Sequence, residues 1–124
     1  VLYRRARHIV TENLRTQTSA MALRSGGLKT AGQAMRESHA SLRDDYEVSC
    51  RELDVMSDLA NAQPGCYGAR MTGGGFGGCA VALVDNGAVD AFVTAVAPAY
   101  EAETGLTPQI YVCQAGAGSS VERL

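Results

Sequence analysis

The chain has 124 residues, of which 46% are hydrophobic and 19% are charged. This length and composition are typical of one globular domain and exclude a disordered tail. Eleven basic residues against 13 acidic ones give a net charge of −2, which argues against a nucleic-acid-binding domain because such domains present a basic surface. No run approaches the roughly 18 apolar residues of a membrane span.

The chain begins with Val1 rather than methionine, and the arginine-rich stretch that follows lacks the pattern of a secretory signal. We therefore expect the chain to be part of a longer protein.

Four cysteines are spread along the chain without any closely spaced pair: Cys50, Cys66, Cys79 and Cys113. A zinc site normally contains at least one such pair, so no metal site is expected. The cysteines neighbour apolar residues and are predicted to be buried free thiols, with disulfides as the alternative. Free thiols favour a cytoplasmic location.

Three helices are predicted in the first half. Residues 4–24 lack Gly and Pro, and an apolar stripe that can pack recurs there at helical spacing, formed by Ala6, Val10, Leu14 and Met21. Glycines at 26–27 end this helix, and a second periodic run follows from Leu28 to about residue 45. Ser49 and Glu52 match a capping box at the start of a third helix, which the Pro–Gly pair at 64–65 ends.

The second half changes to strands. Residues 66–71 and 79–84 are predicted as strands on either side of a glycine cluster, and residues 88–103 as a helix that Pro98 interrupts or kinks. Residues 110–113 are predicted as a further strand. The order predicts an α+β fold: a ferredoxin-like split βαβ unit with extra N-terminal helices, whose first strand we expect upstream of Val1.

The glycine cluster occupies five of the six positions from Gly73 to Gly78. Its spacing matches the dinucleotide fingerprint, but that motif must open a helix and these glycines precede a strand; a Walker lysine is also absent. Successive backbone N–H groups can bind an anion, and missing side chains allow close approach by a ligand or backbone. A flexible hairpin is the structural alternative. Phe76 suggests that the loop is pinned against a core or a neighbouring domain.

Residues 70–79, Arg-Met-Thr-Gly-Gly-Gly-Phe-Gly-Gly-Cys, resemble the third signature motif of the GHMP small-molecule kinases in its galactokinase form. Residues 38–54 resemble the same branch closely, and residues 5–12 more weakly. Arg51 departs from the proline that is frequent before Glu-Leu-Asp in this family. The resemblance spans about residues 4 to 115.

This resemblance implies that residues 1–124 form the C-terminal domain of a two-domain enzyme. The family transfers the ATP γ-phosphoryl group to the C1 hydroxyl of galactose with Mg²⁺. Its catalytic Asp, sugar motif and Ser-rich phosphate loop belong to an N-terminal domain, and neither motif occurs here. We therefore expect no catalytic residue and no metal ligand in this chain, and no activity from it alone. The expected partners are galactose, ATP and the N-terminal domain, with no nucleic acid or membrane.

The resemblance further implies that the glycine loop closes over the sugar and phosphate end of the cleft. We expect the loop to shape this site rather than to bind the phosphates directly. The loop residues are Thr72, Gly73, Gly74, Gly75, Phe76, Gly77 and Gly78. Supporting roles are expected for Met71, Arg70, Arg43, Asp44, Asp45 and Tyr46. Arg70 is predicted to form a salt bridge or to contact phosphate. The adjacent carboxylates Asp44 and Asp45 diverge on a helix and are not expected to act together. His39 is expected to be packed or hydrogen-bonded rather than a base.

Two other functions stay open on the sequence. The chain could belong to another GHMP sugar kinase, such as an N-acetylgalactosamine kinase, or it could be a free-standing ferredoxin-like binding module.

Overall fold

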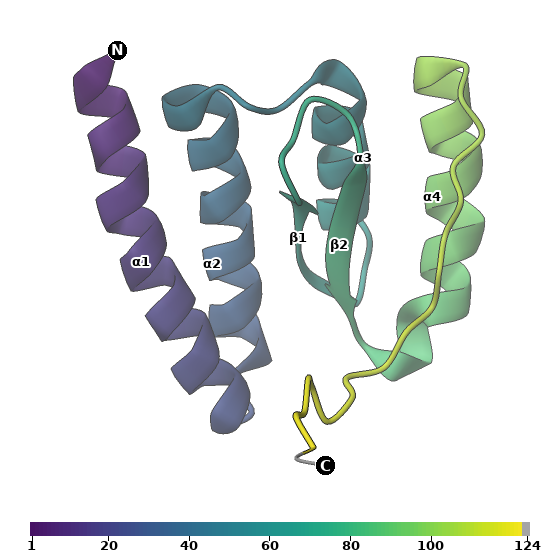
Figure 1. The fold of residues 1–124 in the computed structure, drawn as a ribbon. Coiled ribbons are helices and arrows are strands. Elements are labelled where there is room, and N and C mark those ends of the chain that lie inside the picture. The colour runs from purple at the N-terminus through teal and green to yellow at the C-terminus, as the bar shows by residue number, and fades with distance from the viewer. Residues whose placement is uncertain (123–124) are drawn as a thin grey trace.

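The computed structural model describes residues 1–122. Three helices open the chain: α1 (Leu2–Arg24), α2 (Leu28–Ser41), which continues into a π-helical turn η1 (Leu42–Tyr46), and α3 (Arg51–Asn61). A hairpin of β1 (Cys66–Thr72) and β2 (Cys79–Val84) follows, then a 3-10 turn η2 (Asn86–Ala88) and α4 (Val89–Thr104). Figure 1 shows the hairpin in the middle, with α1 and α2 on one side and α4 on the other. The predicted α+β class is confirmed.

Helix α2 crosses strand β1 at a contact between two glycines. A Cβ on Gly32 would lie 1.9 Å from the carbonyl oxygen of Tyr67, and a Cβ on Gly68 would lie 2.1 Å from the carbonyl oxygen of Gly32. Only residues without a side chain allow two backbones to come this close. Arg36 adds a hydrogen bond, donating from Nη1 to the Tyr67 oxygen at 2.6 Å. Gly32 therefore weakens the helix locally but fixes its distance from the strand.

The hydrophobic core has two parts. One lies between α3, α4 and the hairpin and is built on Ala60, Ala69, Phe92 and Val96. The other lies at the end of β1 that leads into the glycine loop and consists of Leu42, Leu53 and Met71, with Met71 fully buried. This second part ties η1, α3 and β1 together at the root of the loop.

The first helix differs from the prediction in the face that it buries. The apolar stripe is exposed, with Val10, Leu14 and Met21 each at least 60% accessible. The face that packs against α2 is polar: it contains the buried His8 and the partly buried Glu12. Hydrogen bonds to partners on α2 and β1 satisfy these groups and make the polar contact possible.

The predicted strand at residues 110–113 is wrong. The sheet of residues 1–122 has two strands, and residues 106–122 contain no regular secondary structure. A strand needs a hydrogen-bonded neighbour, and the only strand pairing among the described residues joins β1 to β2. Helix α4 continues through Pro98, so of the two predicted effects of this proline the interruption is wrong, whereas the kink stays a prediction. The helix ends at Gly105, where φ is 72°.

Two local predictions also need correction. Helix α3 begins after Cys50, and Ser49 donates its hydroxyl hydrogen bond to Asp54 Oδ1 at 2.6 Å instead of capping the helix. The helix begins one residue later than the capping box requires, with Cys50 at the N-cap position, so Ser49 is not placed to accept from the amides of the first turn. The four cysteines are free as predicted, but Cys79 and Cys113 are exposed and the other two only partly buried. No helix within residues 1–122 is long and apolar enough to cross a membrane.

Candidate functional site

The glycine loop joins β1 to β2 beyond the last strand pair, Thr72 with Cys79. Its backbone takes positive φ values at Gly73, Gly75, Gly77 and Gly78, between 80° and 147°. These values are accessible to glycine and strained for other residues. The path of the loop therefore explains four of its five glycines.

The middle of the loop rests on the connection between η1 and α3. The backbone N–H of Phe76 donates to the carbonyl oxygen of Val48 at 2.8 Å. A Cβ on Gly75 would lie 2.1 Å from the same oxygen, so this position needs glycine for packing as well as for its φ of 81°. The loop is thus fastened at its centre rather than free along its length.

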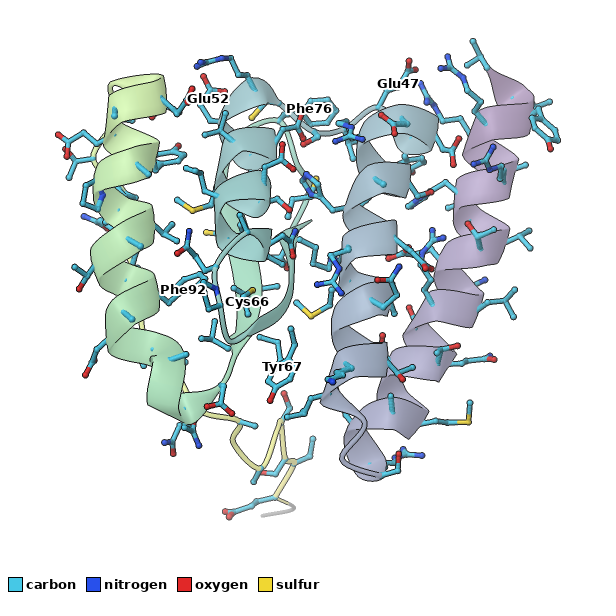
Figure 2. The ribbon with its side chains drawn as sticks, turned by 180° about the vertical axis from the view of Figure 1, so that it is seen from behind. Glu47, Glu52, Cys66, Tyr67, Phe76 and Phe92 are labelled. Carbon is cyan, nitrogen blue, oxygen red and sulfur yellow. The ribbon has the colours of Figure 1, made fainter. Side chains whose placement is uncertain are left out.

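Phe76 is 75% exposed, so the prediction that it is pinned against the core is wrong. Packing on a neighbouring domain stays a prediction. Figure 2 shows Phe76 at the same end of the molecule as Glu47, which follows η1, and Glu52, which opens α3. Beside the loop lies a cleft of about 320 Å³, lined by the loop, α3 and the end of α4 through Phe76, Gly77, Gly78, Glu52, Met56 and Tyr100.

Gly74 differs from the other loop glycines. Its φ is not in the left-handed region, and nothing in the described chain lies within 4 Å of a Cβ built on it. Neither its conformation nor its packing within residues 1–122 requires glycine. A glycine would be required at this position if a group from outside the chain approached the backbone closely.

The backbone N–H groups of the loop are mostly without protein acceptors. Phe76 is the one residue of the described loop whose N–H donates to a backbone carbonyl outside the hairpin, which leaves the other loop amides as donors for a ligand.

Arg70 forms the predicted salt bridge. Its Nη1 lies 3.3 Å from Oε1 of Glu12 on α1, and Glu12 also binds Arg15 at 2.8 Å and accepts from Ser38. Burial raises the pKa of Glu12, but the hydrogen bonds from Ser38 and Arg15 and the nearby guanidinium charges outweigh it, so the pKa is lowered overall. The carboxylate is therefore charged, and it holds Arg70 toward α1.

The two carboxylates of η1, Asp44 and Asp45, bind separate partners. Asp44 pairs with Arg43 on the surface, where Nε and Oδ1 are 2.8 Å apart. Asp45 is buried, accepts a hydrogen bond from Ser41 at 3.2 Å and forms an ion pair with Arg7, whose Nε lies 3.3 Å from Oδ2. The two carboxylates diverge as predicted, and no group of three or more His, Cys, Asp or Glu among residues 1–122 could hold a metal ion.

The other side of this turn is held by α1. Tyr46 stacks on the buried His8 with ring centroids 4.6 Å apart. Glu47 has a left-handed φ of 59°, and Arg5 and Arg4 bind its carboxylate at 2.6 and 3.2 Å. The sequence alone predicted no role for Glu47 or Val48. Their position inside residues 38–54, the stretch that resembles the family, was the one feature of the sequence that could have pointed to them.

The α+β domain with its Thr-Gly-Gly-Gly-Phe-Gly-Gly loop matches a known class of kinase domain. The profile of the family described as "GHMP kinases C terminal" matches residues 19–102, and the chain belongs to this family. The predicted membership is confirmed.

Individual relatives point to one branch of the family. The chain is 58% identical over 115 residues to the galactokinase of Chloroflexus aurantiacus, covering 93% of this chain and 30% of the relative. It is 51% identical over 114 residues to the galactokinase of Roseiflexus sp., covering 92% and 29%. The crystal structure of Lactococcus lactis galactokinase complexed with galactose superposes with a TM-score of 0.87 at 50% identity, over 94% of this chain and 30% of that one. The chain thus spans about 30% of the length of these relatives.

Proposed function

We propose that residues 1–124 are the C-terminal domain of a cytoplasmic galactokinase, which transfers the γ-phosphoryl group of ATP to the C1 hydroxyl of galactose. The observation that carries the proposal is the 58% identity to a galactokinase across 93% of the chain, together with a glycine loop presented at one end of the fold. The similar Lactococcus lactis enzyme was crystallised as a complex with galactose, which supports this sugar over other GHMP kinase substrates.

In this proposal the loop Thr72–Gly78 shapes the phosphate end of the cleft. Phosphoryl transfer depends on positioning and on stabilising charge, and backbone N–H groups that face a ligand serve both. The loop amides fit the phosphates of ATP as hydrogen-bond donors, and Gly74 leaves room for a close approach. No group of three or more His, Cys, Asp or Glu side chains lies together among residues 1–122. As the family resemblance implies, the proposal places the ligands of Mg²⁺ mainly in the N-terminal part of the enzyme.

The remaining part of the enzyme would supply the catalytic Asp, the sugar motif and the surfaces that cover this chain's exposed apolar groups. Phe76 at the loop tip and the apolar stripe of α1 are candidates for contact with that part, since large apolar groups this exposed commonly mark interfaces. Arg43, Asp44, Asp45 and Tyr46 would support the loop indirectly, by ordering the turn that leads to Val48.

The test is a chimera in which this chain replaces the matching C-terminal 30% of the Chloroflexus aurantiacus galactokinase. Coupled ADP release is measured with galactose, with N-acetylgalactosamine and without sugar. We expect galactose-dependent turnover by the chimera and none by the isolated chain. A folded chimera without turnover would contradict the proposal, and turnover by the 124 residues alone would contradict the assignment of the catalytic residue to the other domain.

A matched control separates loop chemistry from folding. The same chimera with Phe76→Ala keeps the backbone hydrogen bond to Val48 and removes the exposed ring. If the ring docks on the other domain, turnover falls although the stability of the isolated chain is unchanged.

A further inference from the structure

His39 lies on α2 beneath the point where β1 passes into the glycine loop. Its side chain is buried, and its Nδ1 accepts the backbone N–H of Met71 at 3.1 Å. Met71 is fully buried and immediately precedes Thr72, the first residue of the loop. Because a backbone amide can only donate, Nδ1 of His39 carries no proton.

The opposite edge of the ring faces a carboxylate. Nε2 of His39 is 3.0 Å from Oδ1 of Asp54 on α3, and the same oxygen accepts from Ser49 Oγ at 2.6 Å. A carboxylate can only accept, so Nε2 carries the proton. The two partners thus select the neutral Nε2–H tautomer and fix the plane of the ring.

The charges around the ring act in opposite directions. Burial lowers the pKa of His39; Asp54 and Asp58 of α3 oppose this effect and Arg43 of η1 adds to it. Strand β1 presents the uncharged Met71 amide. The lowered pKa is consistent with a ring that stays neutral at neutral pH, as the hydrogen bond to Met71 requires.

These contacts form a frame with two attachment points. His39 holds the root of the loop through Met71, and Val48 holds its centre through Phe76. Ser49, next to Val48 in the chain, binds the same Asp54 that orients His39. The root and the centre of the loop are therefore connected through one carboxylate–histidine pair.

We propose that His39, oriented by Asp54, is a positioning residue that sets where the glycine loop leaves β1. The catalytic consequence rests on the proposed function; the positioning itself does not. Protonation of Nδ1 would turn its N–H toward the N–H of Met71. Because both groups are donors, the hydrogen bond would be lost and the root of the loop would be released.

Two amide substitutions separate the partners of the ring. In His39→Asn the amide oxygen can take the place of Nδ1 and accept from Met71, whereas the contact with Asp54 is lost. In His39→Gln the amide nitrogen can take the place of Nε2 and donate to Asp54, whereas Met71 loses its acceptor. Both variants remove the ring, so a general packing role predicts similar effects.

The first readout is NMR on the 124-residue chain. Nitrogen shifts of wild-type His39 should show the Nε2–H tautomer. Exchange of the Met71 amide should quicken about tenfold in His39→Gln, the equivalent of one ordinary hydrogen bond, and much less in His39→Asn. An Nδ1–H tautomer in the wild type, which needs no variant to fold, or equal effects in the two variants would overturn the proposal.

The second readout is catalysis by the chimera. His39→Gln should lower kcat by about tenfold or more through loop displacement, with a smaller change in KM for galactose, and His39→Asn should retain more activity. The acid-side fall of kcat that follows His39 protonation should disappear in His39→Asn. An inactive wild-type chimera with the NMR contrast intact would contradict the proposed function alone, whereas equal kcat losses in two folded variants would contradict the positioning role.

Discussion

Replacement of Gly75 by alanine tests how the glycine loop is held. The new Cβ would lie 2.1 Å from the carbonyl oxygen of Val48, and ordinary contact begins at 3.4 Å, so the two backbones must separate by about 1.3 Å. That shift breaks the hydrogen bond of 2.8 Å from Phe76 N–H to the same oxygen. The substitution also forces alanine to a φ of 81°.

The magnitude follows from these two losses. A left-handed alanine costs roughly 1–2 kcal/mol, and a lost hydrogen bond costs about 1 kcal/mol, so the free energy of unfolding should fall by about 2–3 kcal/mol. A loop displaced by more than an ångström should lower kcat/KM of the chimera by about 100-fold.

Gly74→Ala is the matched control one residue away. Nothing described lies within 4 Å of its Cβ and its φ needs no glycine, so the stability of the chain should change by less than about 0.5 kcal/mol. The chimera should still lose activity if a phosphate or the other domain approaches this position. Urea unfolding of the isolated chain and coupled ADP release by the chimera measure the two effects. A stable Gly75→Ala chain would show that the loop does not rest on Val48, and full activity in Gly74→Ala would show that nothing approaches this glycine.

Three further results are expected. Gly32→Ala should destabilise the chain by about 2 kcal/mol or more in urea unfolding, because its Cβ meets a backbone carbonyl at 1.9 Å, and unchanged stability would show that α2 can move off the strand. Burial lowers the pKa of His8 and His39, so their contribution to the free energy of unfolding is complete above about pH 6.5 and is lost as the pH falls below it; a flat urea-unfolding profile from about pH 7.5 to 5 would contradict this. Leu14→Lys should reduce self-association of the isolated chain in sedimentation experiments, since Leu14 is 60% exposed, whereas Asn13→Lys, which adds the same charge beside the stripe, should not.

Most of the fold follows from local patterns in the sequence. Glycines and prolines at 26–27, 64–65 and 105 end three helices, and the apolar run 79–84 forms a strand. The exposed stripe of α1 could not be foreseen, because the periodicity that marks a buried face marks an interface with another domain equally well. The buried face of α1 depends on polar partners 26 to 58 residues away, which no local pattern contains.

The candidate site was predictable as a loop but not as a structure. The glycine cluster identified the segment, and the resemblance identified its family. The different roles of the loop glycines could not be predicted from the sequence, because they depend on tertiary contacts: Gly75 packs on Val48, whereas a Cβ on Gly74 would meet nothing in the described chain. The link from His39 to Met71 spans 32 residues and uses a backbone N–H, which has no signature in side-chain chemistry. The strand predicted at residues 110–113 failed because a strand needs a pairing partner, and pairing partners are a property of the tertiary fold.

The catalytic roles proposed for the loop and for His39 assume that this chain completes a galactokinase active site. Phosphorus NMR of the chimera with galactose, ATP and Mg²⁺ addresses this assumption, since it shows which sugar oxygen receives the phosphoryl group. We predict a single phosphoester coupled to the anomeric proton, formed in step with ADP and about 100-fold more slowly in Gly75→Ala. ADP formation without a sugar phosphoester, or a phosphoester at another position of the sugar, would show that the chain does not complete such a site.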